Sequence, residues 1–280
     1  MISIIISSYN RIELFRRSLF SLVKNKPRED WELIVVDEES TQDTLKEVRS
    51  FESQIPFKFI RVKTKDIEDK LGVKKYHNNP CVTNNIGFAH SSGDKIFLMG
   101  NEIIIWDDAI NNMVDEISGK ENYLVLSTTY DVPFQILNVL DIYGSNLVKG
   151  MVRFCKNWPL QSNSYRSNVT NYLSLVNRSA WEALDGYDER YFGGIACEDS
   201  DFYQRFRALP NNEVILSQAI SLHQYHGGKT MYYEPVNLTK ETWDTGVSRN
   251  REFFNKWDGS YKNPQGWKSG EFKVEVIKNV

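Results

Sequence analysis

Two short apolar stretches decide the fold of this chain: Ile2-Ser-Ile-Ile-Ile6 and Trp31-Glu-Leu-Ile-Val-Val36, the second of which ends at Asp37. Unbroken runs of β-branched and aliphatic residues are typical of strands that are buried on both faces of a sheet. Between them, apolar residues recur at helical spacing from Leu14 to Val23. Asn10, with Glu13 three residues further on, has the spacing of a capping box that would begin this helix. The pattern therefore predicts a strand, a helix and a second strand.

The same alternation continues along the first part of the chain. It predicts strands at 57–62 and 95–99, helices at 40–53, 81–91 and 107–117, and a loop at 63–80. After about residue 130 the pattern changes, and a short strand at 173–176 and a helix at 179–184 are predicted there. Strands that alternate with helices indicate right-handed βαβ units and a mostly parallel sheet. We therefore predict an α/β fold: a single Rossmann-like domain in which helices flank a mostly parallel central sheet, followed by a C-terminal extension.

Composition and charge narrow the class of protein. The chain has 280 residues, of which 41% are hydrophobic and 13% aromatic, which excludes intrinsic disorder and supports a large core. A net charge of −3 offers no electrostatic case for a nucleic-acid partner. No apolar run approaches the ~20 residues of a transmembrane segment, and the N-terminus has no signal-peptide pattern. The 3 cysteines are widely spaced, which indicates reduced thiols. We expect a cytoplasmic protein, with peripheral attachment to a membrane surface as the alternative.

Polar residues follow three of the predicted strands at the point where each strand ends. The carboxyl ends of parallel strands meet at one edge of a sheet, which is where ligands of such sheets bind. The three clusters are Ser7-Ser-Tyr-Asn10, Asp37-Glu-Glu-Ser40 and Gly100-Asn-Glu102. Because no glycine-rich loop follows the first strand, a dinucleotide-dependent oxidoreductase and a sugar nucleotidyltransferase are both disfavoured.

Two carboxylates of this edge suit ligand binding. Asp37 ends a buried strand, and its oxygens can accept a hydrogen bond from a ring N–H of a base or from a ribose hydroxyl. Glu38 and Glu39 are expected to form a solvated strand end. Glu102 is the only acid within four residues of its strand end, and its hard oxygens could hold Mg²⁺ or Mn²⁺ against a diphosphate.

Two further clusters lie in the second half of the chain. Cys197-Glu-Asp-Ser-Asp201 follows two glycines on the first turn of a predicted helix. The helix dipole accounts for acids at this position, but clustered carboxylates also suit a general base. His223 and His226 lie just after a short apolar segment. Because glycines follow them, a single histidine that completes an oxygen-rich site fits better than a helical metal-binding pair, and either histidine could be that ligand.

Taken together, these residues resemble a family 2 glycosyltransferase of the GT-A fold. The resemblance covers about residues 1–226 and is carried by Ile2-Ser-Ile-Ile-Ile-Ser-Ser-Tyr-Asn-Arg11, Leu33-Ile-Val-Val-Asp-Glu-Glu-Ser-Thr41, Asn84-Asn-Ile-Gly87, Leu184-Asp-Gly-Tyr-Asp-Glu189 and Glu198-Asp-Ser-Asp-Phe202. It implies a GT-A domain at 1–226, with a nucleotide-sugar-binding half at 1–105 and an acceptor-binding half at 106–226. Residues 227–280 are then expected to form an extension packed on the core.

The resemblance also implies a nucleotide-diphosphate sugar donor, a UDP-sugar before others, and Mn²⁺ or Mg²⁺. It places Ser8 and Tyr9 beside the base, Asp37 in a hydrogen bond to it, and the family's DxD motif at Gly100-Asn101-Glu102. Here the chain departs from the family, because Gly100 replaces the first acid. Asn84 stands where the family often has an arginine that contacts the donor phosphate. The donor-binding residues are thus expected to be Ser8, Tyr9, Asp37, Asn84 and Asn101.

For the reaction, the resemblance implies an inverting transfer to an acceptor hydroxyl. Glu102 and His223 would hold the metal, Asp199 would deprotonate the acceptor, and Glu198 would position it. The acceptor would be a glycan, a lipid-linked glycan or a protein, within glycan or polysaccharide synthesis. The alternative is a catalytically inactive nucleotide-sugar-binding or scaffold protein of the same fold, which the altered DxD motif favours.

Overall fold

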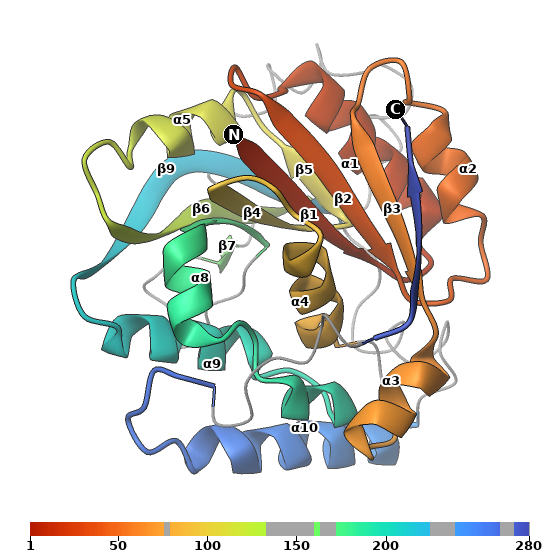
Figure 1. The fold of residues 1–280 in the computed structure, drawn as a ribbon, viewed down its shortest axis with the longest axis vertical. Helices are drawn as coiled ribbons and strands as arrows, with labels where there is room; N and C mark the ends of the chain where they lie inside the picture. Colours follow the sequence, from red (N-terminus) through yellow and green to blue (C-terminus); the bar gives the residue numbers. More distant parts are fainter. Residues whose placement is uncertain (76–78, 133–159, 163–171, 225–238, 264–271, 280) are drawn as a thin grey trace.

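The computed structural model describes residues 1–75, 79–132, 160–162, 172–224, 239–263 and 272–279. Their strands form one sheet, shown in Figure 1. In sheet order these are β10 (Val274–Lys278), β3 (Phe57–Val62), β2 (Trp31–Asp37), β1 (Ile2–Ser8), β4 (Lys95–Gly100), β8 (Leu173–Asn177), β6 (Asn122–Val132), β9 (Asn212–Gln224) and β5 (Ile103–Ile105), while β7 (Leu160–Ser162) pairs with β6. The predicted α/β fold with a sheet flanked by helices is confirmed.

The sheet is parallel only in part. β3, β2, β1 and β4 pair in parallel, and so do β6 and β9. In contrast, β8 runs antiparallel to both β4 and β6, β5 antiparallel to β9, and β10 antiparallel to β3. The prediction of a mostly parallel sheet is therefore wrong, and the sheet is mixed. The strand–helix crossovers, which enforce parallel pairing, end with β4. Of the later strands, β6 and β9 run in the direction of β4, whereas β8, β5 and β10 run in the opposite direction.

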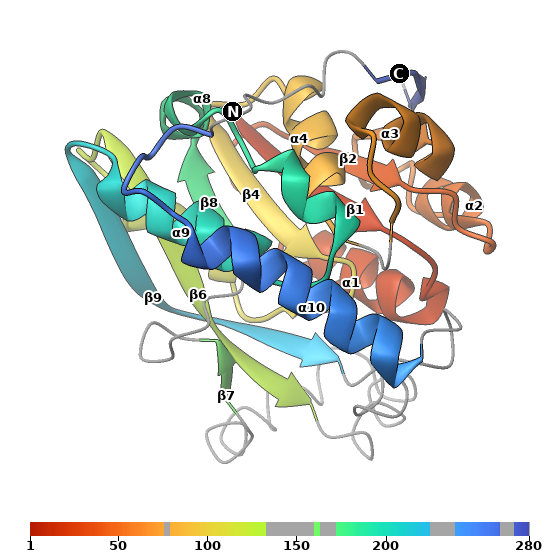
Figure 2. The same cartoon turned by 90° about the horizontal axis from the view of Figure 1, so that it is seen from below.

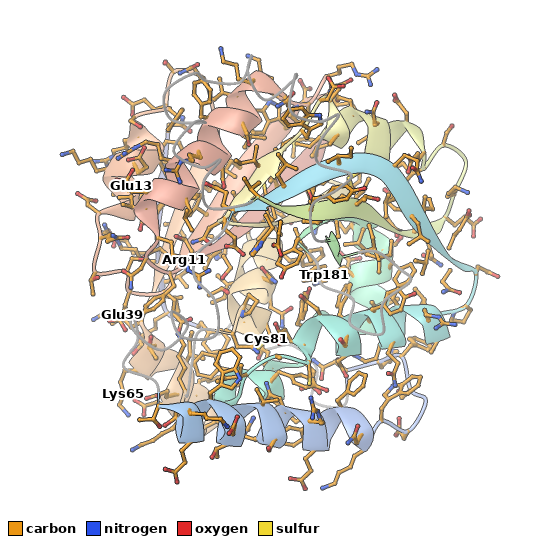
Figure 3. All side chains as sticks on the ribbon, turned by 180° about the vertical axis from the view of Figure 1, so that it is seen from behind. Arg11, Glu13, Glu39, Lys65, Cys81 and Trp181 are labelled. Atoms are coloured by element: carbon orange, nitrogen blue, oxygen red, sulfur yellow. The ribbon has the colours of Figure 1, made fainter. Side chains whose placement is uncertain are left out.

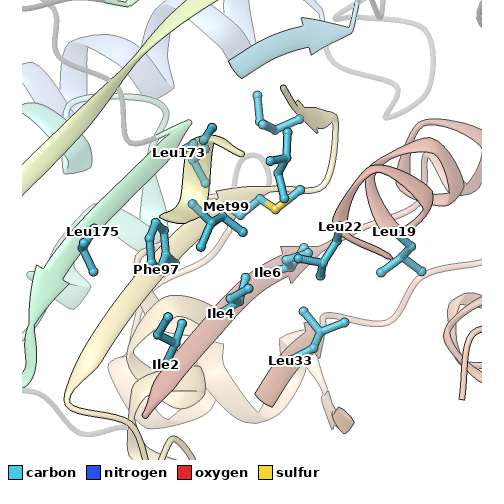
Figure 4. Close-up of a cluster of buried hydrophobic side chains, with 14 of the residues drawn as sticks. Ile2, Ile4, Ile6, Leu19, Leu22, Leu33, Phe97, Met99, Leu173 and Leu175 are labelled. Carbon is cyan, nitrogen blue, oxygen red and sulfur yellow. The ribbon is translucent and has the colours of Figure 1, made fainter. Parts of the chain in front are cut away.

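Alternation along β1 distributes its side chains over two cores, one on each face of the sheet. Ile4 and Ile6 pack in a cluster with α1 (Ile12–Lys24), α2 (Thr44–Arg49) and α5 (Ala109–Asp115), part of which Figure 4 shows. Ile5 packs on the other face, with α4 (Cys81–Ala89), α8 (Arg178–Leu184) and α9 (Glu198–Ala208). A strand with a core on both faces carries apolar side chains on both, which explains why Ile4, Ile5 and Ile6 follow one another in the sequence.

Two local predictions at the N-terminal half are corrected. The capping box at Asn10 does not form: Asn10 and Arg11 both have positive φ, 56° and 61°, and the Asn10 Oδ1 accepts from the Thr41 backbone N–H instead. The stretch predicted as loop contains α3 (Thr64–Leu71). Only Ile67 of this helix is buried, so its sequence lacks the apolar stripe by which a helix is recognised.

The described C-terminal residues contact the rest of the chain through β10, α10 and Asn263. β10 adds an antiparallel strand beside β3, and α10 (Lys240–Asn255), which Figure 2 shows beside α9, packs against the 3₁₀ helix η1 (Glu189–Gly193). Asn250 on α10 donates to the carbonyls of Tyr191 and Ala196. The division of the chain at residues 226 and 227 stays a prediction.

The cysteines and the apolar character of the helices agree with the sequence as far as the described residues extend. Cys81 and Cys197 are free thiols, as predicted, whereas Cys155 lies outside the described residues. Among the helices that the structure describes, none is both long enough and apolar enough to cross a membrane.

Candidate functional site

The carboxyl ends of β1, β2 and β4 lie side by side, as the sequence predicts. Ser8 is the register partner of Asp37, and Ser7 is that of Gly100. Ser8 is fully buried, and its Oγ has no hydrogen-bond partner among the described residues. Asp37 is buried too, and its carboxylate accepts from the backbone N–H and the hydroxyl of Ser40. The three polar clusters therefore form one edge, at which Ser8 carries an unsatisfied polar atom.

Glu38 differs from its predicted place at a solvated strand end. Its side chain is fully buried, and its Oε1 accepts from Lys75 Nζ at 2.6 Å and from the Thr64 hydroxyl at 3.0 Å. The other oxygen, Oε2, has no hydrogen-bond partner in the part of the chain that the structure describes. Burial raises the pKa of Glu38, which the charge of Lys75 offsets in part. Glu39, in contrast, is exposed as predicted.

Lys75 also lies against the ring of Tyr9, the residue that is predicted to lie beside the base of the donor. Its Nζ is 5.1 Å from the centroid of the Tyr9 ring and 5.7 Å from that of Phe192 in η1. A cation at this distance from an aromatic face is attracted by the ring's quadrupole. Sequence reasoning missed Lys75, because nothing local distinguishes it from the other lysines of the stretch predicted as loop.

The two predicted asparagines lie on different elements. Asn101 is buried directly after β4, where its carbonyl accepts from the Ser18 hydroxyl of α1 and its Nδ2 donates to the Asn10 carbonyl at 3.4 Å. Asn84 is buried in α4. The preceding residue of that helix, Thr83, shares a 2.6 Å hydrogen bond with the Ser7 hydroxyl. Both asparagines thus belong to elements that contact the end of β1 or its loop.

Glu102 and His223 come together because β9 lies between β6 and β5. His223 of β9 is the register partner of Ile103, the first residue of β5, and Glu102 immediately precedes that strand. The His223 Nε2 lies 3.8 Å from the Glu102 Oε1. The other Glu102 oxygen lies 3.6 Å from the Arg11 guanidinium at the start of α1, a position that Figure 3 labels.

Asp131 is a neighbour of His223 that sequence reasoning missed. It is the register partner of His223 on β6, and its Oδ1 lies 2.8 Å from the His223 Nδ1. Tyr172 covers the imidazole, with ring centroids 4.8 Å apart. No local pattern marks Asp131, since it lies in the region after residue 117 in which the sequence predicts no strand before residue 173. The alternative ligand, His226, lies outside the described residues.

The pair of Glu102 and His223 fits a divalent cation in its chemistry. Oxygen and imidazole nitrogen are donors that Mn²⁺ accepts. Two ligands at ~2.1 Å from one ion lie no more than ~4.2 Å apart, and the observed separation of 3.8 Å is within that limit. Among the described residues, no cluster of three or more His, Cys, Asp or Glu side chains could hold a metal ion. Within the described ranges, Glu102 and His223 are therefore the two side chains of this pair that could donate to a cation.

The predicted acid pair lies at the start of α9. Glu198 is buried, and its Oε2 accepts from the Asn79 Nδ2 at 2.8 Å. Asp199 is half-buried, and its Oδ1 accepts from the Tyr187 hydroxyl at 3.1 Å. Burial, with the charge of Asp199 in second place, raises the pKa of Glu198 to about 8. Glu198 consequently retains its proton at neutral pH.

The third acid of this segment has a structural role. Asp201 is buried, and it accepts from the Arg205 Nε at 2.7 Å and from the Tyr191 hydroxyl at 3.2 Å. Arg205 in turn donates to the carbonyls of Leu184 and Gly186, which joins α9 to the end of α8. Asp201 therefore stabilises the packing of α9.

The start of α4 contacts both groups of polar residues. Asn79, just before the helix, holds Glu198, while Thr83 within it bonds to Ser7 at the end of β1. The Cys81 backbone N–H, at the helix start that Figure 3 labels, donates to the Asn79 Oδ1. Through these bonds α4 connects the edge at β1 with the acid pair of α9.

Comparisons with known proteins agree with the fold. Residues 3–139 match the model of the family "Glycosyl transferase family 2". The chain is 28% identical over 123 residues to the uncharacterized glycosyltransferase YfnE of Bacillus subtilis, a match that covers 44% of this chain and 28% of that protein. Residues 3–139 are therefore similar to glycosyl transferase family 2, in agreement with the predicted resemblance, and the chain spans only 28% of the length of the curated relative that it matches.

Solved structures are similar over nearly the whole chain. The mannosyltransferase PcManGT of Pyrobaculum calidifontis, in complex with GDP-Man and Mn²⁺, is 15% identical with a TM-score of 0.59 over 95% of this chain and 66% of its own. TarS of S. aureus in complex with UDP is 15% identical with a TM-score of 0.58 over 91% of this chain and 71% of its own. At this identity the similarity establishes a GT-A-like fold and nothing about substrates.

Proposed function

We propose that this chain is a glycosyltransferase that moves a sugar from a nucleotide-diphosphate sugar to an acceptor hydroxyl. The observation that carries the proposal is the approach of Glu102 and His223, 3.8 Å apart, at the sheet edge that also holds Ser8 and Asp37. A metal-ligating pair beside a buried, unpartnered hydroxyl and a carboxylate suits a ligand that has a diphosphate at one end and a nucleoside at the other.

The donor is proposed to be a UDP-sugar. Its base lies beside Ser8 and Tyr9, its polar edge bonds to Asp37, and Asn84 and Asn101 contact the rest of the nucleotide. The unpartnered Oγ of Ser8 supports this placement, because a buried hydroxyl without a partner is stabilised by a ligand that bonds to it. Two similar folds, both of TarS, hold UDP and UDP-GlcNAc, while that of PcManGT holds GDP-Man with Mn²⁺.

The reaction is proposed to be inverting. Glu102 and His223 would hold Mn²⁺ or Mg²⁺, whose positive charge would stabilise the departing diphosphate. Asp199 accepts the proton of the acceptor hydroxyl, whose oxygen attacks the anomeric carbon from the face opposite the diphosphate. Glu198 keeps its own proton at neutral pH, because its pKa is raised, and it positions the acceptor by hydrogen bonding. We propose a glycan, a lipid-linked glycan or a protein as the acceptor.

A second candidate function is nucleotide-sugar binding without transfer. The observation in its favour is Gly100, which removes the first acid of the motif and leaves only a two-residue metal site among the described side chains. In this case the nucleotide sugar binds at the same edge of the sheet, but the bond between sugar and diphosphate breaks too slowly for turnover.

The test is a thermal-shift screen with UDP-, GDP-, CMP- and dTDP-sugars, each with and without Mn²⁺. A ligand that binds only the folded chain stabilises it by ~2.7 kcal/mol at a hundredfold excess over its Kd. A Mn²⁺-dependent shift with UDP-sugars supports the proposal, and a shift with another base alone overturns the choice of UDP. A shift without release of UDP or transfer of sugar supports the second candidate. The lack of a shift with every donor, in a folded sample, overturns both.

A further inference from the structure

The register of three strands brings Asp131 to the far side of the imidazole that faces Glu102. β9 carries His223 between β6, where Asp131 is its register partner, and β5, which Glu102 precedes. The Nδ1 of His223 lies 2.8 Å from Asp131, and its Nε2 lies 3.8 Å from Glu102. Only 7% of the imidazole is exposed, so its orientation is set by these neighbours and by the Tyr172 ring.

The two ring nitrogens therefore have different partners at different distances. A carboxylate only accepts hydrogen bonds, so the 2.8 Å contact with Asp131 requires a proton on the His223 Nδ1. In a neutral imidazole the Nε2 then carries a lone pair, directed to the side of Glu102. A lone pair and a carboxylate oxygen 3.8 Å apart attract a cation between them.

We propose that Asp131 is the positioning residue of the cation site: it holds His223 in the Nδ1–H tautomer and thereby presents the Nε2 to a divalent cation beside Glu102. This inference rests on the proposed function, whose metal site it extends by one residue that does not itself touch the ion. Carboxylates that orient a ligating histidine raise its basicity and fix its ring, and their loss typically lowers metal affinity 10- to 100-fold.

Three variants separate positioning from mere packing. Asp131→Leu removes the acceptor with little change in side-chain size, whereas Asp131→Asn retains an oxygen that can accept from the Nδ1–H. Asp69→Leu is the matched control, because Asp69 is an exposed aspartate on α3 that pairs with the exposed Lys65. We expect Mn²⁺ to bind Asp131→Leu about 10- to 100-fold more weakly than the wild type, Asp131→Asn in between, and Asp69→Leu as the wild type does.

The tautomer of the His223 imidazole can be measured in the metal-free chain. The chain has 4 histidines, so nitrogen NMR of the full chain labelled in histidine, with His223→Gln to assign the signal, reports the two nitrogens of His223. We expect a protonated Nδ1 and an unprotonated Nε2 in the wild type and in Asp131→Asn. In Asp131→Leu the Nε2–H form should gain population. This readout does not depend on activity, and Asp131→Asn serves if the leucine variant does not fold.

The outcomes distinguish this inference from the function on which it rests. A protonated Nε2 in the metal-free wild type overturns the inference, and so does equal Mn²⁺ affinity in wild type, Asp131→Leu and Asp131→Asn. In both cases the wild type still binds Mn²⁺ and the proposed function stands. If Mn²⁺ does not bind the wild type at all, the metal site of the proposed function fails and the inference fails with it. Weaker Mn²⁺ binding together with a shifted tautomer supports the inference.

Discussion

The Asn79 side chain donates a 2.8 Å hydrogen bond to Glu198, and this bond connects the residue before α4 with the first residue of α9. Glu198 is buried beside the charge of Asp199, which is why its pKa rises to about 8, while Asp199 is half-buried and bonded to the Tyr187 hydroxyl. Glu198 therefore retains its proton at neutral pH. This agrees with the proposal that Glu198 donates a hydrogen bond to the acceptor while Asp199 is the base.

The stability of the folded chain should fall with rising pH on account of Glu198. Its folded pKa, about 8, lies above the ordinary 4.5, so the folded state binds this proton more tightly than the unfolded state does. The stabilisation is then fully present below about pH 4.5 and is lost as the pH rises to about 8. In Glu198→Gln, whose amide can still accept from Asn79, this part of the decline should be missing. Urea unfolding of both proteins across that range measures it, and parallel curves would contradict the raised pKa.

Asp199→Asn should abolish transfer while donor binding stays nearly unchanged. The amide retains an oxygen for the Tyr187 hydroxyl but cannot take a proton, and loss of a general base typically lowers kcat by 10²- to 10⁴-fold. Turnover and donor Kd, measured on the same sample, check this. Near-normal turnover would remove Asp199 as the base.

Glu102→Ala should weaken Mn²⁺-dependent donor binding. Loss of a direct ligand should lower the metal affinity at least 10- to 100-fold, which is the typical effect of losing a residue that only orients a ligand. Glu13→Ala is the control, because Glu13 is an exposed acid in the first turn of α1 and also pairs with an arginine. Calorimetric titration of donor with and without Mn²⁺ measures the effect. An unchanged metal dependence would place the cation elsewhere.

Lys75→Met should destabilise the chain, because it leaves the fully buried Glu38 without its cation. Removal of one partner of a buried ion pair typically lowers the free energy of unfolding by about 3–5 kcal/mol. Lys65→Met is the matched control: its ion pair with Asp69 is exposed, so no measurable change in unfolding is expected. Equal unfolding midpoints for the two variants would show that the contact between Lys75 and Glu38 contributes nothing to stability.

Several parts of the fold and the site could be predicted from sequence because their signals are local. Runs of neighbouring residues indicate the strands at 2–6 and 31–36 and the acids that begin α9. The prediction failed where the signal was weak or absent. α3 buries a single side chain, and its sequence therefore reads as loop. Glu38 looks like its exposed neighbour Glu39, because the lysine that pairs with it lies far along the chain.

The sequence by itself determined the order of the first strands and helices, the polar edge at their carboxyl ends and the family to which the first half is similar. These features follow from the spacing of apolar residues and from short motifs, which are local properties of the sequence and do not depend on tertiary contacts. Tertiary structure alone decided that β9 lies between β6 and β5 and so surrounds His223 with Asp131 and Glu102. The physical reason is that strand order arises from the packing of the whole sheet, so no local pattern records which polar side chains meet across it.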